Sequence, residues 1–207
     1  GQGVAQSTVG RTEWKRIEGF YRPPAEGYLR SALAISVPPG QTAEVDDVAV
    51  ELMDLPAVPA GADVVLETEL VRMAVSSQGL LREFRSKASG NDYAVAGTPV
   101  SVLHAVCRGV ATPLHSLTRD GDVLRAQFLD PEVRATVRIV PRKQHILFEI
   151  VEVQPAGVEE LILRFPVRRL TAVGGAFNAT YDDQFGVCLL GVTENTDQQT
   201  VPHGSEV

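Results

Sequence analysis

The sequence predicts an all-β protein, an antiparallel β-sandwich with a small additional β-sheet, and three observations support this. Apolar and polar side chains alternate in residues 133–140 (VRATVRIV), a period of two that is typical of a strand with one buried face. Turn-forming residues recur between such segments at intervals of roughly 8–12 residues, as they do in sandwiches and barrels. No amphipathic segment is long enough to predict a helix of three turns.

The chain divides into five parts by composition. Residues 1–12 are small and polar, and they predict a flexible arm. Residues 13–53 form a first structured stretch, and residues 54–63 (DLPAVPAGAD) have the Pro, Gly and Ala content of a linker. Residues 64–194 then form the sandwich domain, and residues 195–207 are a polar tail.

The sandwich domain contains a series of apolar segments that we expect to form strands. These are residues 64–75, 101–108, 123–129, 133–140, 146–153, 161–167 and 186–193. Residues 101–108 could form a short helix, but they lack capping residues, and a strand is preferred. Residues 146–153 (ILFEIVEV) are apolar at both parities, so we expect that strand to be covered on both faces. Turns are expected at Gln78-Gly79, Ser89-Gly90-Asn91-Asp92, Asp120-Gly121-Asp122, Pro141-Arg142 and Gly174-Gly175.

The composition limits the possible classes of function. The 207 residues carry 19 Lys and Arg against 26 Asp and Glu, which gives a net charge of -7, and neither half of the chain is basic. A footprint that neutralises nucleic-acid phosphates is therefore not expected. The hydrophobic content of 44% argues against disorder. No run of about 20 apolar residues predicts insertion into a membrane, and no charged and apolar leader opens the chain.

The sequence lacks the motifs of known catalytic sites. It holds no Gly-x-Ser-x-Gly elbow, phosphate-binding loop, His-Glu-x-x-His or Cys-x-x-Cys. No two of its four histidines lie within four residues of each other, which excludes a metal-binding pair on one helical turn. An isolated histidine in a β-protein is more often structural than catalytic. If the chain were an enzyme, the candidate pairs would be His145 with Glu149, His115 with Asp120, and Asp182 with Tyr181.

Two adjacent carboxylates, Asp46 and Asp47, lie in the apolar segment 43–53 (AEVDDVAVELM). Neighbours on a strand point to opposite faces, so at least one carboxylate should point inward and would need a partner. Oxygen ligands of this kind suit a structural calcium ion. The alternative is that one aspartate begins or bulges the strand while the other is solvated. For the pair Glu159 and Glu160 we expect a solvated loop.

The two cysteines, Cys107 and Cys188, both lie in predicted strands. A disulfide between them would close a long loop and could stabilise the fold by about 4 kcal/mol. Two buried thiols that pack as small apolar side chains are the alternative.

Aromatic residues gather in the first structured stretch, at Trp14, Phe20, Tyr21 and Tyr28. An exposed Trp or Tyr can stack on the apolar C–H face of a sugar ring. Trp14, Tyr21 and Tyr28 are therefore the candidate carbohydrate-binding residues. The alternative is packing in a core, which is favoured for Trp14.

Residues 13–52 (EWKRIEGFYRPPAEGYLRSALAISVPPGQTAEVDDVAVEL) resemble the C-terminal half of a carbohydrate-binding jelly roll of the kind found beside xylanases. The likeness rests on Trp14 to Ile17, on Tyr21 to Pro24, on a strand that ends near Pro38, and on the acidic pair before alternating valines. It implies either a truncated carbohydrate-binding module or a smaller accessory sheet that packs on the main domain. In that family a structural calcium often lies near the closing acidic strand.

Residues 64–194 resemble the N-terminal β-supersandwich of large bacterial glycoside hydrolases, which is related in fold to galactose mutarotase. The segments that carry the likeness are SSQGLLREFRSKASGNDYAVAG, SLTRDGDVLRAQFLDPEVRATVRIVPRKQHILFEIVEV and GAFNATYDDQFGVCLLGVTENT. Mutarotases use a positioned histidine and carboxylate, and no matching motif occurs here. The resemblance therefore implies a supporting domain and not the mutarotase activity.

These observations lead to three hypotheses about function. In the first, the chain is a non-catalytic, carbohydrate-binding accessory region of a secreted bacterial glycan-degrading enzyme, extracellular or periplasmic. Its partners would be a polysaccharide or oligosaccharide and the catalytic domain of the same parent chain. In the second, it is a sugar epimerase or lyase with a His and carboxylate pair. In the third, it is a cell-surface structural or adhesion module. We expect the first, with no nucleic-acid partner and no certain cofactor.

Overall fold

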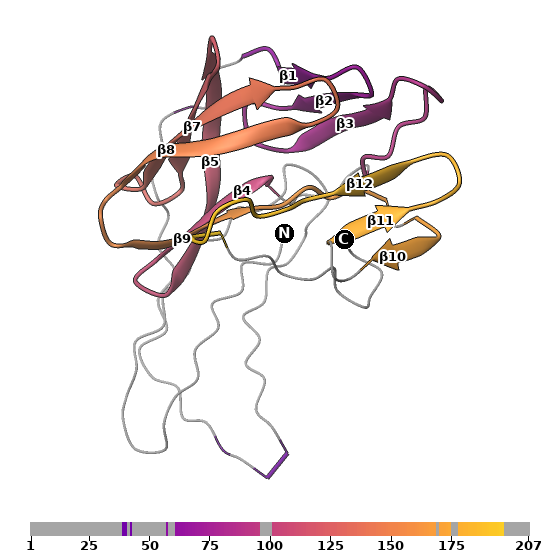
Figure 1. Cartoon of the computed structure of the whole chain (residues 1–207). Helices are drawn as coiled ribbons and strands as arrows, with labels where there is room; N and C mark the ends of the chain where they lie inside the picture. Colours follow the sequence, from indigo (N-terminus) through magenta and orange to yellow (C-terminus); the bar gives the residue numbers. More distant parts are fainter. Residues whose placement is uncertain are drawn as a thin grey trace.

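The computed structural model describes residues 39, 40, 42, 57, 61–95, 101–168, 170–174 and 178–196 (Figure 1). All regular elements in this part of the chain are β-strands, and all of their pairings are antiparallel. The predicted arm at 1–12, nearly all of the stretch 13–53 and most of the tail lie outside the described residues. The prediction of an additional sheet from residues 13–53 therefore stays a prediction.

The strands follow one another along the chain in the order of their labels. They are β1 (Val64–Glu67), β2 (Val71–Val75), β3 (Leu81–Ser86), β4 (Leu103–Cys107), β5 (Val110–Asp120), β6 (Val123–Phe128), β7 (Arg134–Pro141), β8 (Ile146–Gln154), β9 (Val158–Leu163), β10 (Ala172–Gly174), β11 (Ala179–Tyr181) and β12 (Gly186–Cys188). They form a three-stranded sheet β1-β2-β3, a six-stranded sheet β8-β7-β6-β5-β4-β9, and a small sheet β10-β11-β12. This arrangement confirms the predicted all-β antiparallel sandwich.

The core lies between the first two sheets. Met73 and Phe84 from the three-stranded sheet share one apolar cluster with Leu117 and Phe128 from the six-stranded sheet. The alternation in residues 133–140 is confirmed, because Val133, Ala135, Val137 and Ile139 are all buried while Arg134 and Arg138 are exposed. One face of the six-stranded sheet is thus apolar and covered, and the opposite face carries polar side chains.

Strand β5 changes partners halfway along its length. Its first part pairs with β4, from Val110 opposite Cys107 to Pro113 opposite His104. Its second part pairs with β6, and the register shifts between Leu114 and Ser116. His115 is the extra residue of this β-bulge, which bends the strand. The bulge explains how Leu114, His115 and Leu117 can all be buried although their parities differ.

The small sheet β10-β11-β12 lies beside the end of the sandwich that contains β3 (Figure 1). The small sheet contacts the core through aromatic side chains. The Phe185 ring stacks on Tyr93 with centroids 4.3 Å apart, and it meets Phe84 edge-to-face at 6.1 Å. Such pairs add about 0.5–1.5 kcal/mol to the free energy gained by burial.

Three expectations about individual segments were wrong. Residues 64–75 form two strands, β1 and β2, because Thr68 stops the first strand by accepting hydrogen bonds from the amides of Leu70 and Val71 through its hydroxyl. Glu159 and Glu160 belong to strand β9 and not to a loop. Strand β8 is not covered on both faces, because it is the edge of its sheet, and Ile150 and Val151 are 55% and 49% exposed.

Candidate functional site

The polar face of the six-stranded sheet is hollowed over β5, β6, β7 and β8, and this hollow has a volume of about 330 Å³. It is lined by Ser116, Thr118, Arg125, Ala126, Gln127, Arg134, Ala135, Thr136, Glu152 and Gln154. Pockets that bind small ligands commonly measure about 300–1,000 Å³, so this hollow is large enough for a small polar ligand.

The polar side chains of the hollow form two rows that cross four strands. Strand register places Ser116 opposite Gln127, Gln127 opposite Arg134, and Arg134 opposite Gln154. The second row consists of Thr118, Arg125, Thr136 and Glu152, paired in the same way. Residues directly opposite on neighbouring strands lie about 4.5–5.5 Å apart, so each row forms a continuous line of hydrogen-bonding groups.

The first row is held in place by side-chain hydrogen bonds. The Gln127 amide Nε2 donates to the carbonyl oxygens of Pro131 at 3.0 Å and Val133 at 3.1 Å, both in the turn between β6 and β7. The Gln154 amide donates to Glu152 Oε1 at 2.6 Å. These contacts fix two planar side chains at the hollow, which lowers the entropy that a ligand would have to remove on binding.

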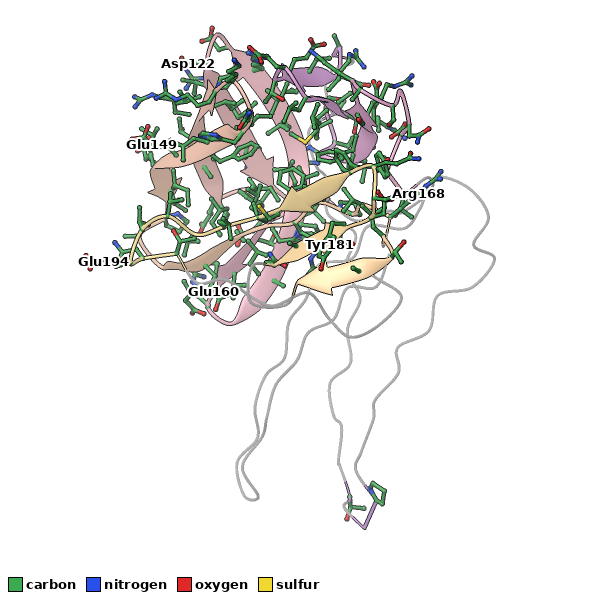
Figure 2. The ribbon with its side chains drawn as sticks, turned by 45° about the vertical axis from the view of Figure 1, so that its right-hand side comes forward. Asp122, Glu149, Glu160, Arg168, Tyr181 and Glu194 are labelled. Carbon is green, nitrogen blue, oxygen red and sulfur yellow. The ribbon has the colours of Figure 1, made fainter. Side chains whose placement is uncertain are left out.

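The charged groups around the hollow differ in how they are paired. Arg138, two residues beyond Thr136 on β7, lies 3.0 Å from Glu149 and 3.9 Å from Asp122, and both carboxylates lie at the same end of the molecule (Figure 2). Arg125 lies 3.7 Å from Asp120. Within the described ranges, Arg134 makes no ion pair and Glu152 contacts no cation, so the hollow holds one unpaired charge of each sign.

A second cavity lies inside the core and is too small for a ligand. Its volume is about 30 Å³, and its walls are apolar side chains such as Leu66, Met73, Phe148 and Phe165. The space is about that of one water molecule, but a water needs polar partners, which these walls do not provide. We interpret this cavity as a packing void.

His104 on β4 is the most perturbed titratable group that the structure describes. Its Nδ1 atom is buried without a hydrogen-bond partner. Burial, together with the positive charge of Arg164, lowers the pKa of His104 from 6.5 to about 4. Opposite it across the strands stand Pro113 and Ile162, which offer no side-chain acceptor, so the neutral imidazole serves packing.

We predict that His104 makes the stability of the protein depend on pH. Its folded-state pKa lies below the unfolded-state value, so the unfolded chain binds more protons between pH 6.5 and pH 4. The contribution of neutral His104 to the free energy of unfolding is therefore complete above pH 6.5 and is lost as the pH falls toward 4. Urea unfolding at several pH values measures the effect. Over this interval the free energy of unfolding should fall on the order of 2 kcal/mol more for the wild type than for His104→Gln. His145→Gln, which changes an exposed histidine, should keep the wild-type slope. Equal slopes for all three proteins would contradict this prediction.

In the three residue pairs named for an enzyme, strand geometry separates the partners or the carboxylate has another role. His115 is buried at the bulge of β5, while Asp120 is exposed at the end of that strand, roughly 15 Å further along. His145 and Glu149 lie four positions apart along extended chain, and Glu149 pairs with Arg138. Asp182 and Tyr181 are neighbours, but the carboxylate of Asp182 accepts from the amides of Gln184 and Phe185 and so closes a turn.

The candidate carbohydrate-binding residues Trp14, Tyr21 and Tyr28 lie outside the described residues, as do the candidate calcium ligands Asp46 and Asp47. Their roles stay predictions. The part of the chain that the structure describes contains no group of three or more His, Cys, Asp or Glu side chains placed to hold a metal ion.

Of the two possibilities for the cysteines, the disulfide is not formed. Cys107 and Cys188 are both free, Cys107 buried and Cys188 exposed. The sulfur of Cys107 lies 3.6 Å from the carbonyl oxygen of Gly157, so this thiol packs in the core, as the alternative required. Cys188 is not a buried thiol, because its short strand β12 lies at the edge of the small sheet.

Sequence reasoning did not find the hollow. One signal for it was present, because the alternation in residues 133–140 already placed Arg134, Thr136 and Arg138 on the face opposite the core. The remaining polar side chains come from three other strands, and their alignment with β7 depends on register. Register follows from pairing and bulges, which a single strand's pattern does not reveal.

Comparison with known proteins identifies no relative. No family model, no curated protein and no solved structure matches the chain. Among the described residues there is also no helix long and apolar enough to cross a membrane.

Proposed function

We propose that this chain is a non-catalytic, carbohydrate-binding accessory region of a glycan-degrading enzyme, and that the hollow on the six-stranded sheet holds the glycan. The observation that carries the proposal is the double row of polar side chains across β5, β6, β7 and β8. The likeness of residues 13–52 to part of a carbohydrate-binding module supports the same class of ligand.

The chemistry of the hollow suits a sugar. Arg offers only donors, Glu accepts, and Gln, Ser and Thr do both, so the rows can satisfy hydroxyl groups that are themselves donors and acceptors. The hollow is open to solvent and is built on strands, which keep their side chains in fixed register. Its floor is the backbone of β6 and β7 at Ala126 and Ala135, whose own side chains are buried on the core face of the sheet.

The biological setting belongs to the same proposal. The parent protein would be a secreted bacterial enzyme, extracellular or periplasmic, and the catalytic domain of the parent chain would be the second partner. Trp14, Tyr21 and Tyr28 would add stacking contacts to the glycan, and Asp46 and Asp47 would hold a structural calcium ion.

The proposal predicts that filling the hollow abolishes glycan binding. Thr136 stands at the centre of the second row, between Arg125 and Glu152. Thr136→Trp keeps a residue that strands accept, and its indole would occupy the hollow. In affinity gel electrophoresis against a panel of neutral and acidic polysaccharides, the wild type should be retarded by at least one polymer. The variant should bind that polymer at least about tenfold more weakly, a loss of about 1.4 kcal/mol.

The control for this experiment is Arg82→Trp, which places the same indole on an exposed position of β3 in the other sheet. It should bind as the wild type does, and thermal melts of all three proteins should confirm that they fold. The proposal fails if no polysaccharide retards the wild type, or if Thr136→Trp binds normally. Turnover of a sugar substrate that is lost on replacing His145 or His115 would show instead that the chain is an enzyme.

One observation favours the structural or adhesion alternative. Strand β8 is an open edge of nine residues with exposed apolar side chains at Ile150 and Val151. An edge of this kind can pair with a strand of another chain. Glu149 and Glu152 on the same strand oppose such pairing with a second copy, because like charges would be brought together.

A further inference from the structure

We infer that the ligand of the hollow is an anionic glycan, one that carries a carboxylate or a sulfate ester, and that Arg125 and Arg134 hold this anion between them. The inference rests on the proposed function, because it names the class of sugar that the same hollow would take. Strand register, the pairing of the charges and the position of Glu152 support it.

The register of β6 and β7 places the two arginines in diagonal positions. Arg125 is directly opposite Thr136, and Arg134 is opposite Gln127, two residues away on each strand. Diagonal neighbours on one face of a sheet lie roughly 7–8 Å apart, a separation that long side chains can bridge. An anion between them would receive charge-assisted hydrogen bonds from both guanidinium groups, and these bonds are about twice as strong as neutral ones.

Ion pairs among the described residues neutralise this pair of cations only in part. Arg134 makes no ion pair with any described residue. Arg125 has only the contact with Asp120 at 3.7 Å, between side chains that are 64% and 80% exposed. Exposed pairs of this kind contribute little, so a ligand anion can replace Asp120 at low cost. Arg138 differs, because Glu149 holds it at 3.0 Å.

This local charge is unusual for the chain as a whole. The protein carries a net charge of -7, yet the lining of the hollow has two arginines and a single carboxylate, Glu152. Glu152 is opposite Thr136, so it lies across β7 from Arg125 and diagonal to Arg134. It would accept a hydrogen bond from a sugar hydroxyl, and its charge would repel an anion that moved away from the two arginines.

The test compares matched polymers with and without the anion. The wild-type chain should bind polygalacturonate at least about tenfold more tightly than its fully methyl-esterified form, or a sulfated galactan more tightly than its desulfated form. A preference for polygalacturonate would identify the anion as a carboxylate, and a preference for the sulfated galactan would identify it as a sulfate ester. Binding to the charged polymer should weaken as salt is added, because the contacts are exposed.

Two substitutions should shift the affinity in opposite directions. Arg134→Gln should weaken binding to the preferred acidic polymer roughly tenfold, whereas Glu152→Gln should strengthen it severalfold by removing the repulsion. The controls change the net charge equally elsewhere. They are Arg82→Gln on β3 and Glu160→Gln on β9, at the opposite edge of the sheet. Figure 2 shows Glu160 well apart from Glu149, which lies on the β8 side.

The outcomes separate this inference from the proposed function. If acidic and neutral polymers bind equally and Thr136→Trp abolishes both, the hollow binds glycans and the inference about the anion is wrong. If Arg134→Gln and Arg82→Gln weaken acidic binding by the same factor, the effect comes from net charge and the inference is again wrong. If no polymer binds, the proposed function fails.

Discussion

Replacing Phe128 by alanine should lower the free energy of unfolding by about 3–5 kcal/mol. Among the described residues, Phe128 is the largest fully buried side chain, with 0% of its surface exposed. It lies on β6 opposite Leu114, at the point where the register of β5 shifts. The surrounding strands are fixed by their ladders and can close the resulting cavity only in part, so packing as well as hydrophobic burial would be lost.

Urea unfolding followed by circular dichroism measures this effect. Val151→Ala on the exposed edge strand β8 serves as a control and should change the free energy of unfolding by less than about 0.5 kcal/mol. A loss below about 1 kcal/mol for Phe128→Ala would contradict the core described above. Because Gln127 is the adjacent residue and belongs to the hollow, weaker glycan binding by Phe128→Ala would also show that the core supports the site.

Replacing Gly79 by alanine should lower the free energy of unfolding by about 2–4 kcal/mol, the second largest loss that we predict. Gly79 has a φ of 75°, a conformation that is unfavourable for other residues. A Cβ atom there would lie 2.3 Å from Leu114 Cδ2 and 2.8 Å from Ser101 Oγ. Both neighbours are buried, so neither can move aside freely.

The position of Gly79 makes the clash costly for the whole sandwich. Its carbonyl oxygen accepts a hydrogen bond from the Val102 amide at 2.8 Å, and Ser77 in the same turn accepts one from Leu117 at 2.7 Å. This turn therefore joins the three-stranded sheet to β4 and β5 of the six-stranded sheet.

Gly90→Ala provides a matched control for Gly79→Ala. Gly90 also has a φ of 75°, but no atom lies within 4 Å of the position that a Cβ would take there. Gly90→Ala should lower the free energy of unfolding by only about 1 kcal/mol, the cost of the positive φ without a steric clash. Equal losses for the two variants in urea unfolding would contradict the role of the close approach at Gly79.

Much of the sandwich was predictable because single strands carry their own signal. The alternation in residues 133–140 correctly predicted a buried face from Val133 to Ile139. The predicted turns at Gly79, Gly90 and Gly121 are confirmed, since all three glycines have positive φ. These features depend on neighbours in sequence, on side-chain parity and on the conformational freedom of glycine.

Other features escaped prediction because they depend on residues distant in sequence. The apolar character of residues 146–153 predicted burial on both faces, but the position of β8 at the edge leaves Ile150 and Val151 exposed. A tight turn at Arg108-Gly109, with φ values of 54° and 73°, was also missed, because arginine seldom adopts this conformation.

The sequence by itself determined that this protein is an antiparallel β-sandwich, because a period of two with glycine turns permits few other packings of an apolar face. Only the tertiary structure decided where a ligand can bind. The hollow exists because the bulge at His115 and the pairing of β5 to β8 align side chains from four strands into two polar rows. Side-chain alternation sets which face each residue occupies, whereas strand register sets which residues of different strands stand together.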